Sequence, residues 1–150
     1  MFGEVPLPLD SPVYVTHEHA SAYAAWSGGA LPSEAQWHRA AEGARAAGNL
    51  DFRFWDPIPV DATPEGDSVW GVSQLIGNGW EWTSTPFHPF PGFEPFPFYR
   101  GYSADFFDGR HFVLKGASPR TAARMARHSF RNWFRPAYPY VYAGFRVVKA

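Results

Sequence analysis

The sequence predicts one α+β domain, in which two short helices precede short antiparallel strands joined by long loops. Its 150 residues include 15 Pro and 14 Gly, and 19% are aromatic, a mixture that favours a loop-rich fold with rings in its interior. Two helix-capping patterns occur near the start of the chain, and apolar runs of strand length follow only later. The length suits a single domain, residues 1–150, with a core of its own.

The two helices are predicted from their ends. Thr16 can cap a helix that runs through Ser27, and Gly28 stops it. Ser33 and Gln36 form a capping-box pattern that opens a second helix. Along that second helix apolar side chains recur at helical spacing, at Trp37, Ala40, Ala41 and Ala44.

After the helices the pattern changes to loops and short strands. Residues 49–68 hold five acidic side chains, three prolines and no sustained period, which is typical of a loop. Residues 86–108 contain five prolines among many rings, so they cannot form a helix, and we expect a long ordered loop packed on the domain. Short strands are predicted at 69–75 and 80–84, around the Gly77–Asn78–Gly79 turn, and at 113–116 and 142–149.

Charge and composition narrow the classes of partner. A formal net charge of −1 argues against a nucleic-acid-binding surface. No apolar run approaches the roughly 20 residues of a membrane span, and no signal-peptide pattern opens the chain, so we expect a cytoplasmic protein without a membrane partner. The absence of cysteine excludes disulfides, thiolate metal sites and thiol nucleophiles.

Two places in the sequence, a pair of histidines and one glutamate, could be considered as metal sites. His17 and His19 lie two positions apart on a helix and point about 200° apart, which favours a polar helix start over a shared metal. Glu81 lies between Trp80 and Trp82 on a strand and should face away from both rings. Its carboxylate can either accept hydrogen bonds from buried backbone amides or bind a hard cation.

The segment 120–140 is the richest in groups that bind small ligands. It interleaves five arginines with Trp133, Phe134, Tyr138 and Tyr140. Guanidinium groups beside aromatic faces suit carboxylates and quaternary ammonium groups. The alternative is that some arginines support loops by bonding backbone carbonyls, which we favour for Arg120 and Arg146.

Three short sequence motifs together resemble one known family. They are LPSEAQW at 31–37, GNGWEWTS at 77–84 and YAGFRVV at 142–148. In this order they resemble the formylglycine-generating-enzyme and sulfatase-modifying-factor group, whose fold is C-type-lectin-like, and the resemblance spans about 12–148. It implies a structural calcium site whose ligands would be Gln74, the carbonyls of Gly77 and Gly79, and Glu81. Enzymes that make formylglycine use a cysteine-bound copper site, so the cysteine-free chain is not expected to perform that reaction.

Four further words are similar to the sulfoxide synthases of ergothioneine biosynthesis. They are PFPGF at 89–93, YSADFFDG at 102–109, VLKGAS at 113–118 and SFRNW at 129–133. Those enzymes use non-haem ferrous iron and dioxygen to join a cysteine-type thiol to the imidazole of Nα-trimethylhistidine. The resemblance implies that Trp133 and Tyr140 line a betaine pocket with Asn132 and Phe134, and that Arg127 and Arg131 orient carboxylates. Tyr99 or Tyr102 would donate a proton or hydrogen bond near the iron.

The resemblance covers only part of a sulfoxide synthase. It corresponds to the C-terminal part of a synthase, without the four-helix domain that holds the iron and without the first part of the lectin-like domain. We therefore expect Fe(II) to come from another domain or a partner chain, and pairing with that partner or homodimerisation through exposed strand edges. The alternative is a non-catalytic lectin-like module that binds a small ligand or a protein.

Overall fold

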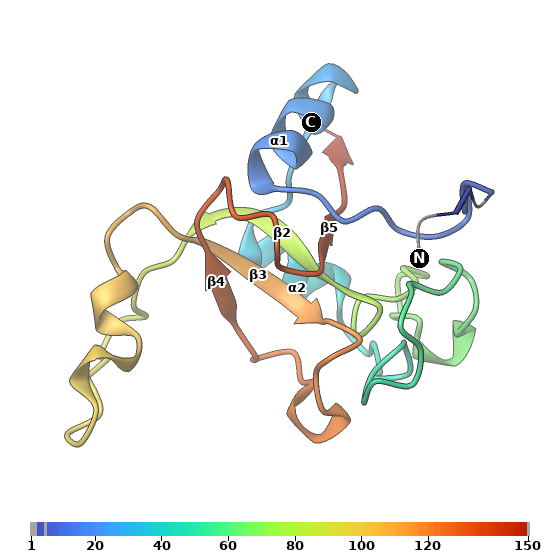
Figure 1. The fold of residues 1–150 in the computed structure, drawn as a ribbon. Helices are drawn as coiled ribbons and strands as arrows, with labels where there is room; N and C mark the ends of the chain where they lie inside the picture. Colours follow the sequence, from blue (N-terminus) through green and yellow to red (C-terminus); the bar gives the residue numbers. More distant parts are fainter. Residues whose placement is uncertain (1–2, 5, 150) are drawn as a thin grey trace.

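The computed structural model describes residues 3–4 and 6–149, and both predicted helices are present in it (Figure 1). Helix α1 spans His17–Trp26 and helix α2 spans Glu34–Ala40. The hydroxyl of Thr16 accepts a hydrogen bond from the His19 N–H, and Ser33 and Gln36 complete the predicted capping box. Neither helix is long and apolar enough to cross a membrane, and this holds for all residues described.

The strands form one mixed sheet of four and one separate pair. In the four-stranded sheet the order is β4-β3-β2-β5, and β1 pairs with β6. Neighbours in the four-stranded sheet are antiparallel except β2 and β5, which are parallel. This confirms the lectin-like α+β prediction and adds one parallel pair to it. The strands are β1 Gly29–Ala30, β2 Gly79–Pro86, β3 Phe112–Ala117, β4 Asn132–Phe134, β5 Ala143–Phe145 and β6 Val148–Lys149.

The two helices cover opposite faces of the sheet. Trp80 and Trp82 of β2 pack with Ala20 and Ala24 of α1 in one buried cluster. On the other face, Trp37 of α2 belongs to a second cluster and donates its indole N–H to Glu81 at 2.9 Å. Glu81 therefore faces away from both neighbouring indoles, as the alternation along a strand predicts.

One predicted strand is absent, and another is divided into two. Residues 69–75 form no strand, because Gly71 and Gln74 adopt positive φ values of 71° and 51° and the Ser68 hydroxyl accepts from nearby backbone N–H groups. The predicted strand at 142–149 is broken at Arg146, whose side chain turns to Glu81. Strands β1 and β4 were not predicted, since two or three residues carry no detectable period.

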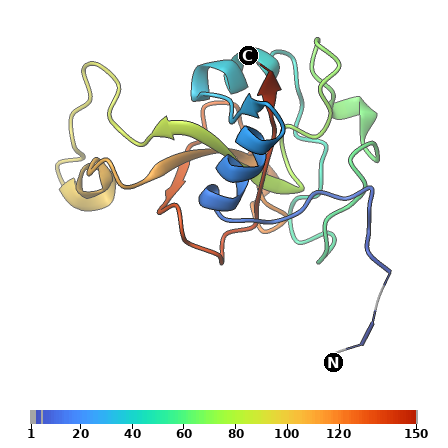
Figure 2. The same ribbon diagram turned by 90° about the horizontal axis from the view of Figure 1, so that it is seen from above.

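The aromatic loop that follows β2 is not packed on the domain as expected. Figures 1 and 2 show this segment, drawn in yellow, projecting from the sheet as an arm with two short 3₁₀ turns. We call residues 88–105 the arm. Near its tip, Phe96 and Phe98 are 67% and 90% exposed. The prediction failed because only the base of the arm is tied down, by a hydrogen bond from Phe87 N–H to His111 C=O at 2.7 Å and by ring contacts.

Candidate functional site

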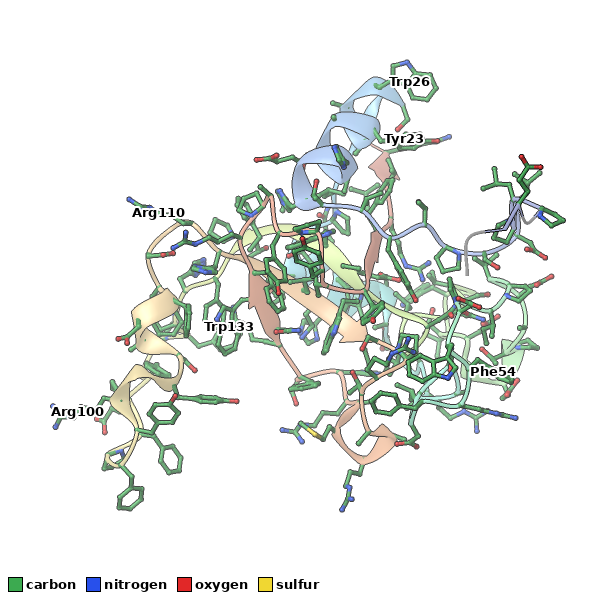
Figure 3. All side chains as sticks on the ribbon, viewed as in Figure 1. Tyr23, Trp26, Phe54, Arg100, Arg110 and Trp133 are labelled. Carbon is green, nitrogen blue, oxygen red and sulfur yellow. The ribbon has the colours of Figure 1, made fainter. Side chains whose placement is uncertain are left out.

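A cluster of aromatic rings lies where the arm leaves the sheet, and Trp133 is its centre. The Trp133 indole stacks on Phe87 with ring centroids 4.2 Å apart and planes 6° apart. Phe106 contacts the same indole at 5.5 Å. Figure 3 shows Trp133 between the sheet and the arm that carries Arg100. Strand β4 positions Trp133, because its register with β3 places it opposite Val113.

A small pocket of about 190 Å³ opens beside this cluster. Its volume is below the roughly 300–1,000 Å³ of pockets that enclose whole ligands, so it fits one group of a ligand. The walls are apolar and aromatic, with the Arg131 guanidinium as the charged member. They are formed by Phe87, Pro89, Phe90, Phe93, Ser103, Phe107, Arg131 and Trp133.

The two candidate tyrosines are not equivalent. Tyr102 meets the Trp133 ring edge-on at 6.2 Å. Tyr99 contacts Tyr102 at 5.7 Å and lies one ring farther from the pocket. Both are exposed, at 62% and 64%, so their hydroxyl groups are accessible to a ligand or partner. Of the two, Tyr102 is the one that the structure brings to the cluster.

Arg131 is held by a buried carboxylate. Its Nη2 donates to Glu34 Oε2 at 3.0 Å, and its Nε lies 2.9 Å from Glu34 Oε1 without the alignment of a hydrogen bond. A third contact runs from Nη1 to the His88 C=O at 3.2 Å. The guanidinium thus lies 4.9 Å from the Phe87 ring centre and 4.4 Å from that of Phe90. Because Glu34 opens α2, the helix start fixes the charged wall of the pocket.

Lys115 completes this network from the middle of β3. Its side chain is fully buried, and Nζ donates to the carbonyls of His128 and Phe130 at 2.8 and 2.9 Å. Glu34 Oε1 lies 3.6 Å from Nζ. Burial lowers the pKa of Lys115 to about 8, although the Glu34 carboxylate favours the charged form. Lys115 therefore ties the loop before β4 to the sheet that positions Trp133.

The other predicted ligand residues do not reach the pocket. Phe134 follows Trp133 on the strand, so it faces the other side of the sheet and stacks on Tyr138 at 4.7 Å. Tyr140 contacts Tyr138 and is 79% exposed. The Asn132 side chain accepts from the Trp133 backbone N–H, and the exposed Arg127 bonds the Ser129 hydroxyl. Of the six predicted substrate-binding residues, the structure thus brings Arg131 and Trp133 to the pocket and leaves the other four outside it.

An Asp–His pair closes the base of the arm. His111 is buried, and its Nδ1 lies 2.9 Å from Asp108 Oδ1. Phe106 packs edge-on against the His111 ring at 5.2 Å. The hydrogen bond from His111, together with the Arg110 N–H, lowers the pKa of the Asp108 carboxyl. Since Phe106 also contacts Trp133, this pair positions one wall of the aromatic cluster.

The four predicted calcium positions lie together, but away from the aromatic pocket. Gln74, Gly77, Gly79 and Glu81 all line a larger cavity of about 860 Å³ at the β5 edge of the sheet. We take the smaller aromatic pocket as the candidate site, because it gathers the aromatic and arginine residues that suit a small charged ligand.

The present contacts of Glu81 do not fit a calcium ion. Arg146 Nε donates to both Glu81 oxygens, at 2.8 and 2.9 Å, and Trp37 donates to one of them. The amide oxygen of Gln74 accepts from the Asn78 side chain. A cation at this point would have to displace Arg146, whose pKa the Glu81 carboxylate raises against the effect of its burial. Calcium therefore stays a prediction that requires a rearrangement.

Iron has no matching set of ligands in the part of the chain that is described. Residues 3–4 and 6–149 contain no group of three His, Asp or Glu side chains that could hold a metal ion. His17 is buried and packs on Phe112 and Trp82, with Nε2 3.1 Å from the Thr83 C=O.

Arg120 donates to the backbone carbonyls of Phe54 and Trp55, as expected for an arginine that supports a loop.

Sequence reasoning assigned no role to most residues that line the pocket, and three of the missed residues, Glu34, Phe87 and Lys115, hold its charged and aromatic walls in place. A signal existed for one of them. Lys115 lies inside an apolar strand, and a charged residue there is rarely buried without a partner of opposite charge. Its partner Glu34 comes from a distant helix start, and the Phe87 stack depends on the path of the arm. Those two contacts follow from the tertiary arrangement and left no local pattern.

Comparisons with known proteins agree with this architecture. Residues 6–150 match the model of the sulfatase-modifying factor enzyme 1-like domain. The chain is 41% identical over 169 residues to hercynine oxygenase of Mycolicibacterium thermoresistibile, a match that covers 97% of this chain and 38% of that protein. It is 34% identical over 166 residues to ergothioneine biosynthesis protein 1 of Schizosaccharomyces pombe, covering 99% of this chain and 20% of that protein.

A solved structure shows the same fold. PvdO from Pseudomonas aeruginosa superposes with a TM-score of 0.70 at 21% identity, over 97% of this chain and 63% of PvdO. At that identity the likeness concerns the fold alone. The chain thus spans 38% or less of the length of these two curated relatives and about two thirds of the solved one.

Proposed function

Because this chain belongs to the sulfatase-modifying factor enzyme 1-like domain family, we propose that it forms the substrate-binding part of an ergothioneine-type sulfoxide synthase. The relatives named hercynine oxygenase and ergothioneine biosynthesis protein 1 support this pathway. The proposed ligand is Nα-trimethylhistidine, and the proposed reaction joins a cysteine-type thiol to its imidazole. Iron and dioxygen chemistry would be supplied by another domain or chain.

The observation that supports the proposal best is the aromatic wall around Trp133. A quaternary ammonium group has no N–H to donate, so it is recognised by the faces of aromatic rings. Trp133, Phe87 and Phe107 supply such surfaces in a pocket of about 190 Å³, which suits a head group rather than a whole ligand. Tyr102, whose ring meets Trp133 edge-on, adds a ring and an accessible hydroxyl beside this wall.

Arg131 is proposed to orient the ligand carboxylate. Glu34 and the His88 carbonyl use only part of its hydrogen-bonding capacity, and N–H groups remain on both terminal nitrogens. Glu34 and Lys115 would act as positioning residues, because they fix Arg131 and the loop before β4 without lining the pocket. In this arrangement the chain binds and orients the betaine, and Tyr102 offers the proton or hydrogen bond.

Calorimetric titration of the folded chain with Nα-trimethylhistidine, without iron, tests the proposal. Trp133→Ala should weaken binding about tenfold, in line with roughly 1–2 kcal/mol for a cation–π contact. Tyr140→Ala is the matched control and should bind as wild type, because Tyr140 lies outside the pocket. Histidine without the methyl groups should bind more weakly than the betaine.

Two results would count against the proposal. Equal affinity of Trp133→Ala and wild type would remove the aromatic pocket from recognition. No binding by a demonstrably folded chain would favour the alternative of a non-catalytic lectin-like module. The exposed rings of the arm, such as Phe96 and Phe98, are the observation that suits this alternative, because they lie beyond the pocket.

A further inference from the structure

A row of exposed aromatic side chains lies on the side of the molecule away from the arm. Phe52, Phe54 and Trp55 are 58%, 47% and 73% exposed, and the proposed function does not use them. We call residues 52–55 the Phe–Trp loop. Arg53 stands between these rings, with its guanidinium carbon 5.3 Å from the Phe54 ring centre. Clustered exposed rings of this kind mark interaction surfaces.

The Phe–Trp loop is held rigidly in an unusual backbone conformation. Asp51 and Phe52 have positive φ values of 56° and 58°, in the left-handed region that favours glycine. The buried Asn49 side chain fixes the loop, because it donates to the Phe54 C=O and accepts from the Phe54 N–H, both at 3.1 Å. Arg120 donates to two carbonyl groups of the loop. The rings are thus presented outward by a preorganised backbone, which lowers the entropy cost of binding.

The arm carries an exposed apolar segment of its own. Residues 89–98 contain four prolines and four phenylalanines, and they form neither a helix nor a strand. Phe96 and Phe98 are 67% and 90% exposed. Because proline fixes its own φ, such a segment loses little freedom when it docks, and proline-rich segments bind to aromatic surfaces.

The two segments carry opposite charges between their rings. The arm has FEPF at 93–96, and the Phe–Trp loop has FRFW at 52–55. Glu94 and Arg53 are both exposed, and neither forms an ion pair within the part of the chain that the structure describes. Figure 3 shows Phe54 on the opposite side of the molecule from Arg100 of the arm, and Figures 1 and 2 agree. The two segments of one copy therefore do not meet.

We propose that the arm of one copy of this chain docks on the Phe–Trp loop of a second copy, with Glu94 facing Arg53. The phenylalanines of the arm then cover the exposed rings of the loop. A second copy is favoured over an unrelated protein, because this one sequence presents both apolar surfaces with complementary charges. Since each contact joins two different patches, the arm and the loop can be altered one at a time.

Sedimentation velocity over a concentration series tests the proposal, and the unaltered chain should self-associate as its concentration rises. Arg53→Glu and Glu94→Arg each place like charges at the contact and should weaken self-association at least about tenfold. Both positions are exposed, so both variants should stay folded by circular dichroism. Arg110→Glu, which is exposed and outside both segments, makes the same change of charge as Arg53→Glu and should associate as the unaltered chain does.

Combining the two reversals identifies the contact. A chain with both Arg53→Glu and Glu94→Arg should regain self-association, because opposite charges face each other again. An equimolar mixture of the two single variants should form mixed complexes for the same reason. A chain that stays monomeric would overturn the proposal. Association that neither single reversal weakens, as expected for pairing at the edge of β5, would overturn it too.

The outcome is separable from betaine binding. Neither Arg53 nor Glu94 lines the small aromatic pocket, so calorimetric titration with Nα-trimethylhistidine should give the same affinity in both single variants as in the unaltered chain. Self-association without betaine binding would leave this proposal standing and remove the proposed function, and the reverse result would do the opposite.

Discussion

Lys115 shows how a single residue can link the core to the candidate site. Its ammonium group is fully buried, and it is compensated by two carbonyls and by Glu34, which also holds Arg131. Removing one partner from a buried network leaves the other groups desolvated and unpaired, which costs more than an exposed ion pair contributes. Lys115 should therefore affect both the stability of the fold and the shape of the pocket.

Lys115→Met should lower the free energy of unfolding by about 1–3 kcal/mol, because the carbonyls of His128 and Phe130 lose their donor. Urea denaturation measures the change. Lys149→Met, at an exposed position, is the matched control and should leave the unfolding midpoint within error. An unchanged midpoint in Lys115→Met would contradict the network.

The same residue should make stability depend on alkaline pH. The pKa of Lys115 is about 8 in the folded state against 10.5 for an ordinary lysine. Between these values the unfolded chain binds a proton that the folded chain has released, so the free energy of unfolding should rise from about pH 8 to about pH 10.5. Denaturation series at several pH values should show this rise in the wild type and a smaller one in Lys115→Met.

His17 should make the stability of the fold depend on pH in the acidic range. Burial lowers its pKa below 6.5, even though the Thr83 carbonyl favours the protonated ring. As the pH falls through 6.5 the unfolded chain takes up the proton first, so stability should decrease. His17→Gln should flatten this decrease in thermal melts, whereas His19→Gln at an exposed position should follow the wild type. Parallel profiles for His17→Gln and the wild type would refute the assignment.

At the scale of elements, local signals predicted the helices well and the site only in part. Thr16, Ser33 and Gln36 make their capping bonds within a few residues, so the pattern alone places α1 and α2. The resemblance grouped Phe134 and Tyr140 with Trp133, and strand β4 was not predicted from the sequence. Once that strand is known, its alternation places Phe134 on the other face.

Removing the arm should leave the fold stable but should abolish binding at the pocket. Replacing residues 91–104 with a short Gly-Ser linker removes Phe93 and Tyr102 from the site. The other rings that it removes are mostly exposed. We expect a change in unfolding free energy of less than about 1 kcal/mol, as for surface changes, together with loss of betaine binding by calorimetry. The variant with Phe96→Ser and Phe98→Ser at the tip should retain both properties. Unfolding of the shortened chain would show instead that the arm supports the sheet.

At the scale of the whole molecule, one sheet is shared by two cores. Strand β2 contributes Trp82 to the cluster under α1 and Glu81 to the Trp37 contact under α2. A sheet with a helix on each face is a recurrent three-layer arrangement, and neither core can lose its packing without exposing β2. The chain should therefore unfold as one unit.

Trp37→Ala and Trp82→Ala should each reduce stability by about 3–5 kcal/mol, since both rings are almost completely buried. Urea unfolding followed by circular dichroism and by tryptophan fluorescence should give coincident single transitions in every variant that folds. Trp70→Ala, at a half-exposed ring, should lie close to the wild type. Two separated transitions would mean that the cores are independent.

The parallel pairing of β2 with β5 has a consequence for the order in which the chain can fold. Trp80 can pair with Ala143, and Gly29 of β1 with Lys149, only after these C-terminal partners have been synthesised. Contacts between distant segments slow folding, since the loop between them has to close before the contact forms. During synthesis the face of β2 that carries Trp80 and Trp82 thus stays unfinished until Val141 and Ala143 have left the ribosome, and through that interval these rings are accessible to chaperones.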